Sequence, residues 1–295
     1  MMKNQRRTAA AERGQKPLSL ATFASSASLA SFSPFACVTS LGLLALLGCG
    51  AAQGGGQGSE QRSVAEYDLA RDAFQNGRLR EALAHVEQSL EHDEDNAEAA
   101  HLGALVLLNF CALDTRSSDC RFDEAERMAR RALDAQPDMR EAKNTLGVVL
   151  VHQGRHDEAI AVLKPLAEDI LYAAPESSWG NLGWAYLQKG DVDLAIDALR
   201  RAVAAQPLFC VGHYRLGLAY EKRGELAVAR ESFTTALDTE QPECQRLQDA
   251  FEARARVATR EGLTDEARAD LERCRELSPS TPTGKRCASL LGELQ

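Results

Sequence analysis

The residues best able to do chemistry in this chain are its cysteines and histidines. Eight cysteines occur: Cys37 and Cys49 lie in an N-terminal apolar region, and six lie further along. An even number favours disulfide pairing if the chain is exported, and six cysteines allow 15 connectivities. The six histidines form no recognisable ligand set, and no CxxC or Cys/His spacing typical of zinc occurs. We therefore expect disulfides, no metal site and no cofactor.

No catalytic pattern accompanies these residues. The sequence contains no G-x-S-x-G elbow, no phosphate-binding glycine loop and no H-E-x-x-H pair. The formal net charge is −9, whereas a nucleic-acid partner requires a basic face. The sequence therefore predicts neither an enzyme nor a nucleic-acid-binding protein.

One pattern occurs twice between residues 176 and 242. Gly183 and Gly217 are 34 residues apart, and Ala195 and Ala229 are separated by the same interval. A fixed period of this length indicates an array of structural repeats. Each unit reads as two antiparallel helices, and Gly190 marks the turn in the first copy, where glycine can supply a positive φ.

This unit resembles the tetratricopeptide repeat. The small residues allow the two helices to cross closely, and a proline ends the second helix. The resemblance implies an all-α solenoid in which helix pairs stack into a right-handed superhelix, with the first helix of each pair on the concave face. The family's residue types stand in the unit that starts at Glu176, at Trp179, Leu182, Gly183, Tyr186, Gly190, Ala195, Leu199, Ala202 and Pro207.

Six copies of the unit and a final helix account for the chain after residue 62. The second copy holds about nine extra residues between its helices, and two extra residues precede the fourth copy. Residues 282–295 are expected to form a helix that caps the open end of the array. The six repeats are predicted at 63–96, 96–139, 140–173, 176–209, 210–243 and 248–281.

Position in the repeats narrows the pairing of the cysteines. One pair brackets the insertion of the second repeat. A second pair lies where the first helices of neighbouring repeats begin, and a third links the last repeat to the cap. The alternative is that some of these cysteines are simply small buried residues. We predict three local disulfides: Cys111–Cys120, Cys210–Cys244 and Cys274–Cys287.

Residues 1–48 resemble a signal peptide that ends in a bacterial lipobox. Val38 to Leu47 form an apolar run that is too short to cross a bilayer core of about 30 Å but has the length of a signal-peptide h-region. A glycine precedes Cys49, and the resemblance implies that this thiol carries a diacylglycerol. Residues 49–62 are rich in glycine and glutamine and are expected to form a flexible tether. The alternative is a plain signal peptide or a buried apolar segment.

The resemblance also places the partner-binding surface on the first helices of repeats three to five. An apolar groove suits an amphipathic helix or a strand. Two of the candidates, Val151 and Leu187, could instead pack against the next repeat. The Lys/Asn set that holds a C-terminal carboxylate in chaperone-binding members is not reproduced, which argues against an acidic C-terminal tail as ligand. The candidate groove residues are Asn144, Val148, Val151, Trp184, Leu187, Tyr214 and Leu218.

The combination of lipobox, tether, six repeats and paired cysteines resembles the outer-membrane pilotin lipoproteins of type IV pilus systems. Those proteins help a secretin to multimerise. The resemblance implies a monomeric, non-enzymatic scaffold that binds unassembled secretin and is held by its lipid at the periplasmic face of the outer membrane. The alternatives are a general cell-envelope scaffold, acting in peptidoglycan or barrel assembly, and a cytosolic adaptor.

Overall fold

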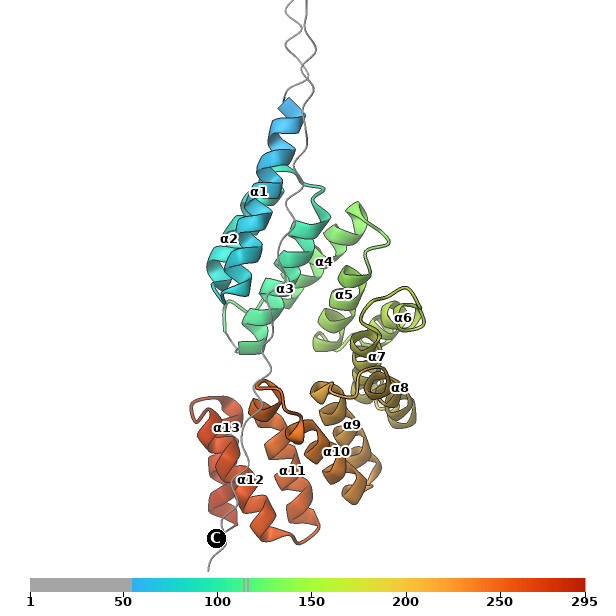
Figure 1. Cartoon of the computed structure of the whole chain (residues 1–295), viewed down its shortest axis with the longest axis vertical. Helices are drawn as coiled ribbons and strands as arrows, with labels where there is room; N and C mark the ends of the chain where they lie inside the picture. Colours follow the sequence, from blue (N-terminus) through green and yellow to red (C-terminus); the bar gives the residue numbers. More distant parts are fainter. Residues whose placement is uncertain (1–54, 114, 116, 295) are drawn as a thin grey trace, which may run out of the picture. The chain divides into compact units, whose positions relative to one another are not determined.

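The computed structural model describes residues 55–113, 115 and 117–294. Within this part of the chain every regular element is a helix, and consecutive helices pack in pairs (Figure 1). This arrangement confirms the all-α repeat fold that the sequence spacing predicts. The pairs are α1 (Gly55–Gln75) with α2 (Leu79–His92), α3 (Ala97–Leu113) with α4 (Phe122–Ala135), α5 (Arg140–His152) with α6 (His156–Ala167), α7 (Pro175–Lys189) with α8 (Val192–Ala205), α9 (Cys210–Arg223) with α10 (Leu226–Asp238), and α11 (Gln248–Arg260) with α12 (Thr264–Leu277), followed by α13 (Pro282–Glu293).

Glycine ends the first helix of most pairs. Gly190 and Gly224 adopt φ angles of 102° and 91°, which residues with a Cβ rarely adopt. The amide of Gly190 still donates to the carbonyl of Tyr186 at 3.0 Å, so the turn satisfies a carbonyl that the helix end would otherwise leave free. These glycines therefore fix where each first helix, called an A helix below, gives way to its partner.

Small residues set the distance between the two helices of a pair. A Cβ on Gly183 would lie 2.6 Å from Cγ of Leu199, and a Cβ on Gly217 would lie 2.5 Å from Cε1 of Phe233. Both glycines are buried, and Leu199 and Phe233 are fully buried against them. The bulky side chain of each second helix thus occupies the space that a side chain on the A helix would need.

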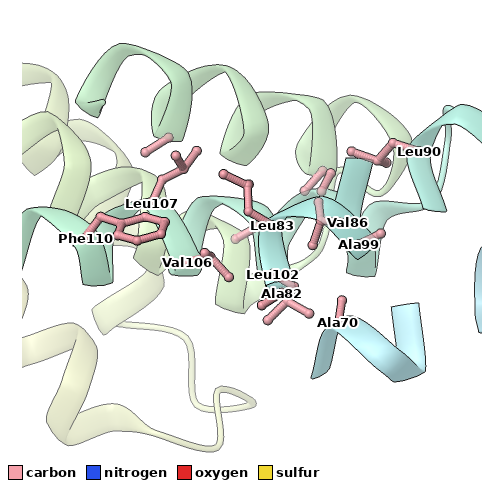
Figure 2. Close-up of a cluster of buried hydrophobic side chains, with 14 of the residues drawn as sticks. Ala70, Ala82, Leu83, Val86, Leu90, Ala99, Leu102, Val106, Leu107 and Phe110 are labelled. Atoms are coloured by element: carbon pink, nitrogen blue, oxygen red, sulfur yellow. The ribbon is translucent and has the colours of Figure 1, made fainter. Parts of the chain in front are cut away.

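The hydrophobic core runs from pair to pair. Figure 2 shows one cluster to which Ala70 of α1, Val86 of α2 and Leu102 of α3 all contribute. A second cluster continues through Leu150 of α5 to Leu182 of α7. Each repeat therefore buries its apolar face against its neighbour, as the quasi-linear stability of a solenoid requires.

Helix α1 begins earlier than the sequence predicts. It starts at Gly55, so residues 55–62, which we expected in the flexible tether, form its first two turns. The prediction was wrong for these residues because their low helix propensity does not prevent them from extending α1, which is already packed from Ser63 onward. Once Ser63 is buried and the helix is nucleated, each further residue adds one hydrogen bond.

Residues 168–174 form a hydrogen-bonded turn between α6 and α7. Asp169 Oδ1 accepts the amide of Leu171 at 2.9 Å, and Asp169 Oδ2 accepts Nε of Arg140 at 2.6 Å. The pKa of Asp169 is lowered, first by the hydrogen bond from Arg140 and then by the bond from Leu171. The turn displays two apolar side chains, Ile170 at 95% and Leu171 at 72% exposure.

Candidate functional site

Hydrogen bonds join each A helix to the next along one face of the array, called the A-helix face below. Asn144 of α5 accepts a hydrogen bond from Asn181 of α7, with 3.0 Å between Nδ2 and Oδ1. Asn181 in turn accepts Nη1 of Arg215, on α9, at 2.8 Å. A bidentate contact between Glu221 and Arg256, at 2.8 and 2.7 Å, continues the series to α11. Residues one repeat apart thus form a polar ladder across four helices.

Arg215 is a cation without a counter-charge at the centre of this ladder. Its Nη1 donates to the carbonyl of Gly180 at 3.1 Å as well as to Asn181, and its guanidinium lies 5.4 Å from the centre of the Trp184 ring. No carboxylate among the described residues lies within ion-pair distance of it. Burial lowers the pKa of Arg215 to about 10, a direct sign that its charge is poorly solvated.

Two arginines of the A helix α11, Arg254 and Arg256, have acidic partners, unlike Arg215. Arg254 donates to both oxygens of Asp270, at 2.8 and 2.7 Å. Burial lowers the pKa of Arg254, but the hydrogen bonds and charge of Asp270 outweigh it and raise the pKa overall. Arg256 is neutralised in the same way by Glu221. The contrast indicates that Arg215 is not placed to complete an internal ion pair.

Histidine adds no second positive charge to the centre of the A-helix face at neutral pH. Burial and the nearby charge of Arg215 both lower the pKa of His152 below its ordinary value. Its ring stacks on Phe122, with ring centres 5.2 Å apart. His152 therefore stays uncharged near pH 7, and the positive charge at this point of the face belongs to Arg215.

The C-terminal part of the A-helix face is charged but neutralised. Glu221 contacts Arg260 at 3.4 Å in addition to Arg256. Glu252 of α11 accepts both Nε and Nη2 of Arg286 of α13, at 2.9 and 2.6 Å. Bidentate pairs of this kind fix orientation and leave little attraction for an additional ion. The paired charges of α11 and α13 thus leave Arg215, at the α7–α9 junction, more available to an ion than they are themselves.

Most of the groove residues predicted from sequence lie on the A-helix face, but two do not. Val151 and Leu187 are only 5% and 4% exposed, and they pack in the cores between repeats. Their assignment to the groove was wrong because a helix carries its core stripe and its exposed stripe only one or two positions apart. The remaining five are partly exposed: Asn144, Val148, Trp184, Tyr214 and Leu218.

Tyr214 contributes more to packing than to a binding surface. Its ring lies 6.0 Å from that of Phe233, and it packs against the cluster around Cys210 and Cys244. Burial raises the pKa of its phenol well above the ordinary value. Trp184 and Leu218, beside Arg215, are therefore the apolar residues best placed to contact a ligand.

Sequence reasoning missed Asn181 and Arg215. Their 34-residue separation places them at the same position of neighbouring repeats, so their contact could have been found from the period alone. The absence of a counter-charge beside Arg215 could not have been found in this way, because it depends on which acidic side chains of several helices approach the site. Only the folded arrangement shows that none does.

The six cysteines in the described chain lie in the three pairs expected from the sequence. Cys111–Cys120 closes the insertion between α3 and α4, with 4.3 Å between Cα atoms. The other two pairs link α9 to the 3-10 helix η1 (Cys244–Arg246) and α12 to α13: Cys210–Cys244 and Cys274–Cys287.

Two further sequence expectations concern the membrane and metal ions. The predicted lipidation site, Cys49, lies outside the described residues. Among the residues that the structure describes, no helix is long and apolar enough to cross a membrane. The same residues contain no group of three or more potential metal ligands.

Comparison with solved structures identifies several similar arrays. The crystal structure of PilW, a widely conserved type IV pilus biogenesis factor, is 23% identical, covers 77% of this chain and 98% of its own, and has a TM-score of 0.63. PilF of Pseudomonas aeruginosa is 19% identical over 79% and 99% of the two chains, with a TM-score of 0.59. A chain of the APC/C hetero-tetramer Cut9–Hcn1 is 17% identical over 79% of this chain and 43% of its own, with a TM-score of 0.65. At these identities the similarity establishes the fold alone.

Comparison with sequence families is more specific. No curated protein sequence matches the chain significantly. A tetratricopeptide repeat model matches residues 67–109, 121–170 and 214–282, and a second such model matches residues 176–207. These matches cover more than half of the sequence and lie within the helical array of the structure. The chain belongs to the tetratricopeptide repeat family.

Proposed function

We propose that this protein is a binding scaffold for a type IV pilus secretin and promotes its multimerisation, as a pilotin. The observation that carries the binding role is the uncompensated charge of Arg215 on the A-helix face, beside Trp184 and Leu218. Support for the secretin as partner comes from the repeat array itself, which matches PilW and PilF over nearly their whole lengths. The bound species is an unassembled secretin segment that carries an acidic residue.

The energetics of Arg215 favour such a ligand. Folding has already removed much of the water from the guanidinium, so an arriving carboxylate gains a charge-assisted hydrogen bond without having to desolvate this cation. A hydrogen bond to a charged group contributes about 1.5–3 kcal/mol. The Asn144–Asn181 contact holds in place the amide group whose oxygen accepts from Arg215, which reduces the ordering cost of binding.

The location of the protein follows from its N-terminal residues in this proposal. A lipidated Cys49 holds the array at the periplasmic face of the outer membrane, where a secretin inserts. The three disulfide pairs suit an oxidising compartment. Mass spectrometry of the mature protein tests the anchor, because lipidation predicts a diacylated N-terminal peptide that begins at residue 49.

The role itself is tested in a deletion strain, with heat-resistant secretin multimers scored on a gel. The wild-type gene should restore multimers and an Arg215→Met variant should not. Arg275→Met is the matched control, because Arg275 is an exposed arginine on the second helix α12. If multimers form normally without the gene, the pilotin proposal is wrong and a general cell-envelope scaffold becomes the better explanation.

A further inference from the structure

A cavity of about 340 Å³ lies between α11, α12 and α13. Ala255 and Leu271 in its lining are almost fully buried, and Leu290 and Leu294 are partly buried. Pockets for small molecules usually span about 300–1,000 Å³. The size and apolar lining of this cavity therefore fit one bulky aliphatic or aromatic side chain better than a larger ligand.

The cavity borders the same face as Arg215. Arg256 lines it and forms a bidentate ion pair with Glu221 of α9, the helix that carries Arg215. Glu252, also in the lining, is paired with Arg286. Arg260, another lining residue, contacts Glu221 at 3.4 Å, so three of the four charged lining residues are paired and the cavity favours an uncharged apolar group.

We propose that the cavity receives a leucine- or phenylalanine-sized side chain of the same segment whose acidic group binds Arg215. This inference rests on the proposed function and adds a second, apolar anchor to it. Packed helices lie about 8–10 Å apart, so the space between α11 and α13 is about 16–20 Å from the α7–α9 junction, where the Arg215 guanidinium lies. An extended segment advances about 3.3 Å per residue. The acidic and apolar residues of the partner are thus about five or six positions apart.

Designed peptides test this geometry directly. Each peptide carries a rhodamine label, an amidated C-terminus, one aspartate and one leucine, with two to eight Gly/Ser residues between them. Fluorescence polarisation with the disulfide-intact protein should show the tightest binding at four or five intervening residues. Replacing the peptide leucine with serine should weaken that binding at least tenfold.

A variant that fills the cavity supplies the protein side of the test. Thr259 is an exposed lining residue, so Thr259→Trp should block the cavity without disturbing the core. Thr235→Trp is the matched control, because both threonines are exposed and both hydroxyls donate to the carbonyl four residues earlier. The Thr259 variant should remove the preference for leucine, and the Thr235 variant should retain it. Equal unfolding midpoints confirm that both variants fold.

The two anchors fail independently. If the peptide aspartate matters but the leucine does not, the cavity inference is wrong and the Arg215 site stands. If leucine matters and Thr259→Trp abolishes its effect while aspartate is dispensable, the cavity inference stands and the Arg215 site is wrong. If neither residue affects binding, both are wrong.

Discussion

Replacing Arg215 with methionine should leave the stability of the free protein almost unchanged. Burial lowers the pKa of this arginine from its ordinary value to about 10, which corresponds to a desolvation cost of about 3 kcal/mol at neutral pH. Methionine removes that cost, but it also removes two hydrogen bonds from a charged donor, worth at least about 1.5 kcal/mol each, and the Trp184 contact, worth about 1 kcal/mol. We expect the free energy of unfolding to fall by only about 1 kcal/mol.

Arg254 provides the internal comparison. It is also partly buried, but it neutralises Asp270, whose side chain is 9% exposed. Arg254→Met leaves that carboxylate buried without its partner, and breaking a buried pair in this way costs about 3–5 kcal/mol. The free energies of unfolding of the Arg215→Met and Arg254→Met variants should therefore differ by at least about 2 kcal/mol.

Urea unfolding followed by far-UV circular dichroism measures both variants. The expected result is a midpoint close to wild type for Arg215→Met and a clearly lower midpoint for Arg254→Met. If Arg215→Met is destabilised as strongly as Arg254→Met, then Arg215 is a structural residue. The argument that its charge awaits a ligand would then be refuted.

Three further predictions concern the framework of the array. Non-reducing urea unfolding of a Cys210→Ser/Cys244→Ser double variant should show a loss of about 4 kcal/mol, as expected for a closed loop of 34 residues; an unchanged midpoint would show that this bond is not formed. Gly183→Ala should cost about 1–3 kcal/mol because its Cβ would lie 2.6 Å from a leucine Cγ, whereas Gly292→Ala, with open space around it, should be neutral or slightly stabilising; equal thermal midpoints would contradict the close crossing. Asp169 has a lowered pKa in the folded protein, so the hydrogen bonds it accepts persist above the ordinary aspartate pKa of about 3.9 and are lost as pH falls below it. Hydrogen exchange at the Leu171 amide, which Asp169 accepts, should therefore become faster relative to its unprotected rate below that pH. Asp169→Asn should remove this pH dependence.

The helical framework could be predicted because each step of the repeat has a local cause. Gly190 needs a positive φ, and Gly183 needs to admit Leu199, so the residue types mark the turn and the crossing directly. The cysteine pairs followed from the same register. Because Cys210 and Cys244 stand where neighbouring A helices begin, the period brought them together.

Burial and charge pairing were harder to predict, because both depend on several helices at once. Val151 and Leu187 have residue types that suit a groove, yet the adjacent repeat covers them. Arg215 looks like any surface arginine in the sequence. Its significance comes from the acidic residues that are absent around it in the fold, and no periodic pattern carries that information.

Site-specific photocrosslinking tests the central claim most directly, since it shows which surface contacts the secretin in the cell envelope. A benzophenone amino acid at Leu218, on the A-helix face, should form a crosslink to secretin monomers. The same group at Val228, an exposed residue of the second helix α10, should not. A Leu218 product that contains secretin would support the account. Absence of that product, or equal crosslinking from both positions, would contradict it.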